Sequence, residues 1–169
     1  MKYVCKRENA LAFVICAGTT FIAFGLAALG IVFEGLFRVF ELISMLLLFY
    51  TAGLFQKHVI SSYEYILDGE DELLSYNRIT VVRAASQKKT SLVCTSLKFL
   101  TYALPEKDAK GLKKELKKKY GKIKILSFCT DIRPKNRAVL VFEYENECVL
   151  MRLQCGEDFI SEIEKRAGV

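Results

Sequence analysis

The fold is decided by residues 10–33, ALAFVICAGTTFIAFGLAALGIVF, and by residues 36–55, LFRVFELISMLLLFYTAGLF, which follow almost at once. The first stretch holds no charged residue, and the second holds only Arg38 and Glu41. A helix needs about 20 mostly apolar residues to cross a bilayer, so each stretch is long enough to span one. The sequence therefore predicts an integral membrane protein with transmembrane helices over residues 10–33 and 36–56.

Two other interpretations exist for apolar stretches of this kind. A helix buried in a soluble core is usually shorter and carries a polar stripe, which neither stretch shows. A secretory signal peptide would account for the basic start of the chain and for the small residues Ala27 and Ala28, but its apolar region is shorter than the first stretch. Even after such a cleavage, the second stretch would remain as an anchor.

The basic residues beside the two stretches predict their orientation. Lys2, Lys6 and Arg7 precede the first stretch and Lys57 follows the second, whereas the connection contributes only Arg38. Basic flanks are retained on the cytoplasmic side. We therefore expect a multi-pass protein of the plasma membrane with both termini in the cytoplasm and with residues 1–9 as an N-terminal tail.

The short connection makes the two helices antiparallel neighbours, and small residues are expected where their backbones approach. Candidate packing positions are Thr19, Ala23 and Ala27 on the first helix and Ser44 and Ala52 on the second. Small residues are common in membrane helices, so a purely compositional origin is an equal alternative. Arg38 and Glu41 share one side of the second helix near its outer end, where charged side chains reach the interface at little cost.

The six cysteines have no C-x-x-C spacing and no histidine cluster beside them. With the soluble part in the cytoplasm, they are interpreted as reduced and mostly structural thiols. They are Cys5, Cys16, Cys94, Cys129, Cys148 and Cys155.

Residues 61–169 change to short alternating runs separated by turn signals, which is typical of strands. Residues 63–67 and 72–82 predict a hairpin, and residues 91–104 predict one or two further strands that Pro105 ends. Residues 106–120 predict a lysine-rich helix, which Gly121 ends. Further strands follow around residues 123–125, 138–144 and 149–153, and an amphipathic helix that ends before Gly168 closes the chain.

This order of elements predicts an α-helical transmembrane hairpin followed by a cytoplasmic α+β domain with a mostly antiparallel sheet. Two arrangements bury its apolar faces. In one, the sheet curves and the last helix plugs it. In the other, a flat sheet carries the helices on one side.

The apolar hairpin, the segment Tyr63-Glu64-Tyr65, the turn Asp68-Gly69-Glu70 and the later Phe142-Glu143-Tyr144 resemble a group of small bacterial membrane proteins. In outline, the soluble part resembles the membrane-attached pleckstrin-homology-like (PH-like) domains of bacteria. The resemblance implies a curved antiparallel sheet and a binding or scaffolding role, and it implies no catalytic residue. The lysine-rich helix inserted between the middle strands departs from a minimal domain of that type and leaves the strand topology open.

No constellation of catalytic residues stands out. His58, the only histidine, lies at the membrane edge, where an interfacial structural role is expected, and the chain has neither a phosphate-binding glycine loop nor a nucleophile elbow. Glu143, Glu145 and Glu147 alternate along a predicted strand, which is typical of a solvated face and less often of a site for a hard cation. We expect no enzymatic activity, no cofactor and no metal site.

The lysines of the inserted helix are the feature of the sequence that points to a function. They attract anionic lipid or a partner protein, while nucleic acid is disfavoured because aromatic residues are not interleaved with them. An ordinary solvated helix face is an equal alternative. The candidate surface is Lys110, Lys113, Lys114, Lys117 and Lys118.

Two functional hypotheses follow. The first is a membrane-anchored interaction or scaffolding module that contacts anionic lipid or a partner protein through the lysine surface. The second is an accessory subunit of a transporter or membrane enzyme that associates through the helical hairpin. The sequence gives no oligomeric state.

Overall fold

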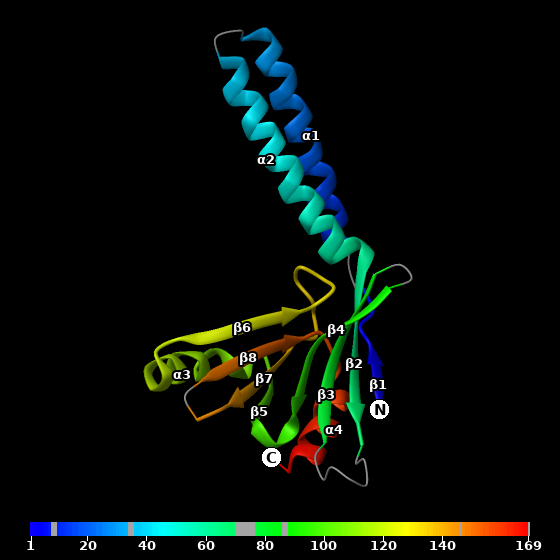
Figure 1. Cartoon of the computed structure of the whole chain (residues 1–169), viewed down its shortest axis with the longest axis vertical. Coiled ribbons are helices and arrows are strands. Elements are labelled where there is room, and N and C mark those ends of the chain that lie inside the picture. The colour runs from blue at the N-terminus through cyan, green and yellow to red at the C-terminus, as the bar shows by residue number, and fades with distance from the viewer. Residues whose placement is uncertain (8–9, 34–35, 70–76, 86–87, 146, 169) are drawn as a thin grey trace.

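The computed structural model describes residues 1–7, 10–33, 36–69, 77–85, 88–145 and 147–168. Two antiparallel helices, α1 (Leu11–Val32) and α2 (Phe37–Phe55), form a hairpin that projects from a domain built of two sheets (Figure 1). A π-helical turn, Gln56–Ile60, continues α2 to the first residue of the domain. The apolar stretches therefore form the predicted pair of neighbouring helices.

Most side chains of this hairpin are apolar and face outward. The mean hydropathy is 2.1 over Leu11–Val32 and 1.6 over Phe37–Ile60. A helix in a soluble core would be mostly buried, whereas only 17% of the most apolar part of α1 is buried inside the structure. Both helices are long and apolar enough to cross a membrane, and the interpretation as core helices does not fit them.

The first sheet is antiparallel and has four strands in the order of the chain. They are β1 (Lys2–Val4), β2 (Ser61–Asp68), β3 (Arg78–Ala85) and β4 (Lys88–Ser96). The predicted hairpin is present as β2 and β3, which pair from Ser61 opposite Ala85 to Asp68 opposite Arg78. Residues 72–76 of the predicted strand lie outside the described residues.

Strand β1 was not anticipated by the prediction of a tail over residues 1–9. Lys2 lies opposite Ile66 and Val4 opposite Glu64, and the amino group of Met1 donates to the carbonyl oxygen of Leu67 at 2.6 Å. Three residues are too few to show an alternating pattern, so the sequence signal of this strand is absent. Because β1 precedes α1 and β2 follows α2, both ends of the hairpin lead into neighbouring strands of one sheet.

The second sheet has the order β5-β7-β8-β6. Its strands are β5 (Leu100–Pro105), β6 (Ile123–Phe128), β7 (Ala138–Glu143) and β8 (Cys148–Leu153). The β5–β7 and β7–β8 pairs are antiparallel, whereas β6 and β8 are parallel. The predicted mostly antiparallel sheet thus contains one parallel pair. A 3-10 turn, Leu97–Phe99, joins β4 to β5 and carries the chain from one sheet to the other.

Two further helices accompany the sheets. Helix α3 (Leu112–Tyr120) follows a 3-10 turn, Asp108–Lys110, and begins later than predicted, because the backbone N–H of Glu106 still donates to Arg137 opposite the end of β5. It ends at Gly121, whose φ of 66° favours glycine. Helix α4 (Glu157–Ala167) ends as predicted before Gly168, at a φ of 73°.

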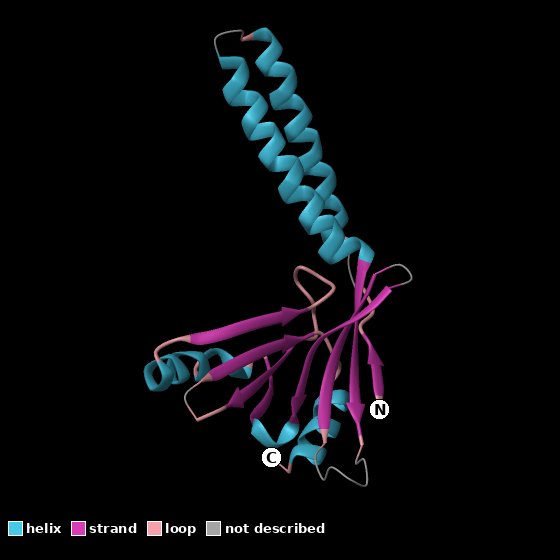
Figure 2. Cartoon of the chain, viewed as in Figure 1, coloured by secondary structure: helices cyan, strands magenta, loops and turns pink. Residues whose placement is uncertain are grey.

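The main core lies between the two sheets and α4. Tyr65 of β2, Phe142 of β7 and Phe159 of α4 are at most 1% exposed and belong to one apolar cluster. Strand β7 is buried on both faces, because Val139 and Val141 pack beneath Leu116 of α3 on the opposite side. Helices therefore cover both faces of the second sheet (Figure 2), which excludes the flat arrangement with helices on one side.

An aromatic cluster ties β1 to this core. The ring of Tyr3 stacks on Tyr65 at a centroid distance of 6.0 Å and lies 5.0 Å from the ring of Phe159. Aromatic pairs of this kind contribute about 1 kcal/mol beyond the area they bury. The first strand is therefore a part of the folded domain.

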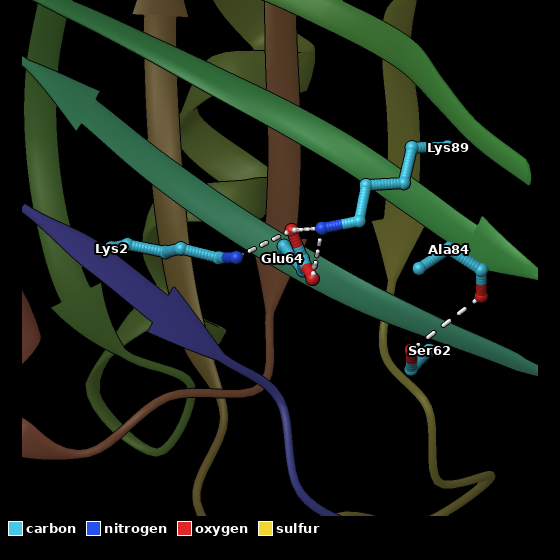
Figure 3. A network of polar contacts seen from close by, with 5 residues as sticks. All are labelled: Lys2, Ser62, Glu64, Ala84 and Lys89. Atoms are coloured by element: carbon cyan, nitrogen blue, oxygen red, sulfur yellow. Dashed lines mark hydrogen bonds and ion pairs between the residues drawn. The ribbon is translucent and has the colours of Figure 1, made fainter. Parts of the chain in front are cut away.

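An ion-pair network crosses the outer face of the first sheet (Figure 3). The carboxylate of Glu64 lies 3.0 Å from Lys2 of β1 and 3.1 Å from Lys89 of β4, and its side chain is only 11% exposed. Hydrogen bonds from Lys2 and Lys89 hold the pKa of Glu64 below its ordinary value of 4.5, although burial opposes this shift. The network links β1, β2 and β4 across the sheet.

Substituting Glu64→Gln is expected to destabilise the domain in a pH-dependent way. Because the pKa of Glu64 is lower in the folded chain, its ionised form stabilises the fold fully above its ordinary pKa of 4.5, and the effect is lost as the pH falls through the lowered value. At pH 7 we expect the melting temperature of the full chain in detergent micelles, followed by circular dichroism, to fall by about 3 °C.

The difference between Glu64→Gln and the wild type should shrink as the pH falls below 4.5 and should vanish once it lies below the lowered pKa of Glu64. The control is Glu145→Gln, since Glu145 is exposed, and it should change the melting temperature little at any pH. An equal loss for Glu64→Gln across the whole pH range would contradict the ion-pair explanation.

Candidate functional site

The lysines of α3 form an exposed basic surface on the second sheet. Lys113, Lys114, Lys117 and Lys118 are exposed, while Leu116 anchors the helix and is 4% exposed. The side chain of Lys110 lies outside what the structure describes. We call the four exposed residues the α3 lysine surface. The single acidic residue of the helix is Glu115, so this surface is strongly positive.

Glu143 of β7 holds the end of this helix. Its carboxylate accepts hydrogen bonds from the Tyr120 hydroxyl at 2.6 Å and from Lys119 Nζ at 2.8 Å. The hydrogen bond from Lys119, followed by that from Tyr120, lowers the pKa of Glu143. Glu145 and Glu147 are exposed, and the three glutamates do not converge on one point of the described structure. Glu143 thus has a structural partner in α3.

The α3 lysine surface is not the basic surface nearest to the hairpin. In Figure 1, α3 lies farther down the long axis of the molecule than β6, which is closer to the hairpin end of the domain. Other basic residues occupy that end. Lys6 and Arg7 precede α1, Lys57 lies in the turn after α2, and Lys88 begins β4.

The strand register brings Lys88 and Lys89 to the same end. Ser61, which follows the π-helical turn directly, pairs with Ala85, and Ala85 pairs with Lys88. The guanidinium group of Arg7 donates to the carbonyl oxygen of Val59 and thereby fixes the chain before α1 to the turn after α2. We call the exposed residues Lys6, Arg7, Lys57, Lys88 and Lys89 the basic collar.

A buried polar network lies directly beneath the collar. The Nδ1 atom of His58 lies 2.8 Å from the carbonyl oxygen of Thr130, so Nδ1 carries the proton and donates it. The Thr130 hydroxyl lies 3.1 Å from Cys5 Sγ. Through these contacts the residues before α1, after α2 and after β6 meet at one point. His58 therefore has a structural role at the base of the hairpin.

Gln154 extends this network into the second sheet. Its side-chain nitrogen donates to Asp131 Oδ2 at 2.9 Å and to the carbonyl oxygen of Lys6 at 3.0 Å, while its backbone N–H donates to the Tyr65 hydroxyl at 3.0 Å. Tyr65 in turn donates to the carbonyl oxygen of Phe128 at 2.6 Å. Both sheets and the segment before α1 are thus joined by one set of hydrogen bonds.

Two thiols near this network, those of Cys129 and Cys155, are not activated. Burial raises the pKa of Cys129 to about 11 and that of Cys155 to about 12, so both stay protonated at neutral pH. A protonated thiol is neither a good nucleophile nor a metal ligand. All six cysteines are described, and only Cys94, on the outer face of β4, is exposed.

The helices of the hairpin contact each other through small and polar residues. The Ser44 hydroxyl donates to the carbonyl oxygen of Ala23 at 2.8 Å, and Ala23 is fully buried. The hydroxyl groups of Thr19 and Thr51 lie 2.8 Å apart. The structure therefore places Thr19, Ala23 and Ser44 between the helices.

The two remaining candidate packing residues are placed differently. Ala27 is half-buried and Ala52 is exposed. Thr51, one residue before Ala52, is the buried residue of that turn. Arg38 and Glu41 are both exposed, and no ion pair between them is present among the described contacts.

Beside Ala52, an apolar groove of about 580 Å³ runs along the outside of the hairpin. Phe13 and Phe55 meet edge to face at one end of it, with their centroids 6.1 Å apart. The groove is wide because alanines lie between the aromatic side chains. Its lining includes Phe13, Ala17, Phe21, Leu48, Ala52 and Phe55.

A second hollow, of about 270 Å³, lies beside the end of β5. Among its charged lining residues, Glu106 forms ion pairs with Arg137 and, at 3.5 Å, with Arg152. The carboxylate is thus shared by two guanidinium groups that connect β5 to β7 and β8. The arrangement stabilises the sheet.

The described side chains include no group of three or more His, Cys, Asp or Glu residues that could hold a metal ion. Comparisons with protein-family models, with curated proteins and with solved structures find no match to this chain. No enzyme family is therefore assigned to it. The features with functional potential are surfaces: the α3 lysine surface, the basic collar and the hairpin groove.

The sequence predicted the α3 lysine surface and part of the contact between α1 and α2, but it did not predict that the collar residues form one surface. Lys88 and Lys89 lie far from Lys6 and Lys57 in the sequence, and only the strand register brings them together. The basic residues that flank the two apolar stretches, Lys6, Arg7 and Lys57, were the sequence signal for one part of the collar. The polar network around Gln154 had no sequence signal, because isolated polar residues in strands do not reveal their partners.

Proposed function

We propose that this chain is a membrane-anchored interaction module of the plasma membrane. In this proposal the hairpin spans the bilayer, both termini lie in the cytoplasm, and the two-sheet domain is held at the inner surface to bind a partner. The observation that carries the proposal is the pairing of β1 with β2 around the hairpin. It fixes a folded domain with exposed basic surfaces at the base of two apolar helices.

The distribution of charge supports the cytoplasmic orientation. The basic collar surrounds one end of the hairpin, whereas Arg38 and Glu41 balance each other near the opposite end. Lysine and arginine residues close to helix ends stay on the cytoplasmic side. Each basic residue near an anionic surface contributes about 1 kcal/mol of attraction. The collar is therefore suited to contact anionic lipid headgroups.

Because the basic collar contacts the lipid headgroups in this proposal, the α3 lysine surface is available to a protein partner. The collar lies closer to the hairpin than α3 does (Figure 1), so lipid contact does not require α3. Acidic partners are favoured by the excess of lysine there, and electrostatic attraction accelerates their association. We further propose that the domain is PH-like, which is supported by two sheets that share a core with a C-terminal helix.

The interaction proposal is tested by reversing charge on α3. Lys114 and Lys118 are exposed and one helical turn apart, so Lys114→Glu/Lys118→Glu changes the surface without disturbing the core. From detergent-solubilised membranes, we expect this full-length variant to retain at most about a fifth of the proteins that the wild type co-purifies, a loss of about 1 kcal/mol.

The matched control for this experiment is Lys135→Glu/Lys165→Glu, which makes the same change of charge at exposed positions away from α3. It should retain the wild-type set of proteins. If quantitative mass spectrometry shows the same set for all three proteins, α3 is not the partner surface.

The orientation is tested through Cys94, the exposed thiol of the chain. If the domain is cytoplasmic, a membrane-impermeant maleimide should leave Cys94 unlabelled in intact cells and label it after permeabilisation. Cys94→Ser should remain unlabelled in both cases, because the other five thiols are buried. In that background Leu36→Cys, at the far end of the hairpin, should be labelled from outside. Labelling of Cys94 in intact cells would reverse the proposed orientation.

The second candidate function is an accessory subunit of a transporter or membrane enzyme. The observation that favours it is the apolar groove of about 580 Å³ on the hairpin, which has the aromatic and small residues that another membrane helix packs against. In this case the hairpin is the working interface and the domain is a cap at its base.

The accessory-subunit function predicts that filling the groove prevents association. Ala17→Leu/Ala52→Leu places two larger side chains in the groove, and we expect at least a fivefold loss of co-purified membrane subunits, or about 1 kcal/mol. Ala28→Leu is the control, since Ala28 is exposed on α1 and does not line the groove. Equal co-purification by all three proteins would remove this alternative.

A further inference from the structure

The two sheets leave a groove where β4 faces β6. These strands are edges of different sheets, and within the described chain β4 pairs only with β3 and β6 only with β8. The groove between them has a volume of about 350 Å³. Its floor is apolar and comes from β4, β6 and the inner face of the second sheet. It includes Val93, Leu126, Phe142, Val149 and Met151.

Of the two edge strands, β6 is better suited than β4 to pair with an added strand. It pairs with β8 without interruption from Ile123 opposite Cys148 to Phe128 opposite Leu153. The pairing of β4 with β3 is broken by a bulge next to Val81 and Val82, and bulges weaken an edge for further pairing. An added strand would thus find a regular row of backbone donors and acceptors on β6.

The charge of the residues around the groove determines which kind of strand can pair with β6. Lys124 of β6 lines the groove and is exposed, and Lys122 precedes the strand. Neither β4 nor β6 contains a carboxylate. A second copy of this chain would bring lysines against lysines across the new pair, and like charges directly opposite one another are destabilising. An acidic strand has the opposite effect.

We propose that the groove binds an extended acidic segment of a partner protein, which pairs with the edge of β6. Lys122, Lys124 and Leu126 share one face of β6, so on the same face of the added segment apolar side chains lie beside Leu126 and carboxylates lie beside Lys122 and Lys124. This mode is strand addition to an open sheet edge, where backbone hydrogen bonds give affinity and side-chain pockets give selectivity. The inference rests on the proposed interaction function and names the kind of partner that it takes.

The experiment uses the full chain in nanodiscs and two fluorescein-labelled peptides of eight residues. In both peptides threonine alternates first with two valines, and then with two glutamates in one peptide or two lysines in the other, so that the valines and the charged side chains share one face. We expect the glutamate peptide to bind at least tenfold more tightly in fluorescence anisotropy. Adding NaCl should weaken it, because the lysines are exposed. Hydrogen exchange of the β6 amides should slow when the glutamate peptide is bound.

Two variants with the same change of charge locate the site. Lys122→Glu/Lys124→Glu should weaken binding of the glutamate peptide at least tenfold. Lys135→Glu/Lys165→Glu, away from both β6 and α3, should change it less than twofold. Because all four lysines are exposed, both variants should keep the wild-type melting temperature.

Equal binding of the two peptides, wild-type affinity in the β6 variant, or unchanged exchange of the β6 amides would overturn the inference. None of these results affects the labelling of Cys94 or the co-purification lost through Lys114 and Lys118. Failure of the groove and failure of the proposed function are therefore separate observations.

Discussion

The architecture depends on the pairing of β1 with β2 across the helical hairpin. Lys2 opposite Ile66 and Val4 opposite Glu64 turn both ends of the hairpin into parts of one sheet. Tyr3 adds a stacked contact to Tyr65, and Gln154 joins Lys6, in the segment before α1, to the second sheet. A domain attached through one linker could rotate about it, whereas two paired strands and a buried polar network define its orientation relative to the helices.

Much of the fold was predictable because its strongest signals are periodic or compositional. The two apolar stretches, the hairpin of β2 and β3, and the closing helix before Gly168 all come from patterns longer than five residues. Strand β1 is shorter than any such pattern and was missed. The parallel pair of β6 and β8 was missed as well, because the alternation of a strand does not identify its neighbour.

The same limit applies to the candidate surfaces: residues close together in the sequence could be predicted, whereas those that the fold brings together could not. The lysines of α3 are close together in the sequence and exposed as a helix repeat predicts, so they were found. Ser44 was identified by size, and its hydrogen bond to Ala23 agrees with that position, whereas Thr51 was overlooked in favour of Ala52. The collar and the groove beside β6 depend on strand register and on the meeting of two sheets, which no local pattern encodes.

The place of β1 in the chain also links formation of the first sheet to packing of the two helices. The first strand is synthesised before its partner, and the complete hairpin separates the two. Bringing Lys2 to Ile66 through a flexible loop would cost closure entropy, which antiparallel packing of α1 and α2 lowers by bringing the loop ends together. Packing of the two helices therefore favours the pairing of β1 with β2. Packing of α1 against α2 and completion of the first sheet are therefore energetically linked, although one lies in the hairpin and the other in the domain.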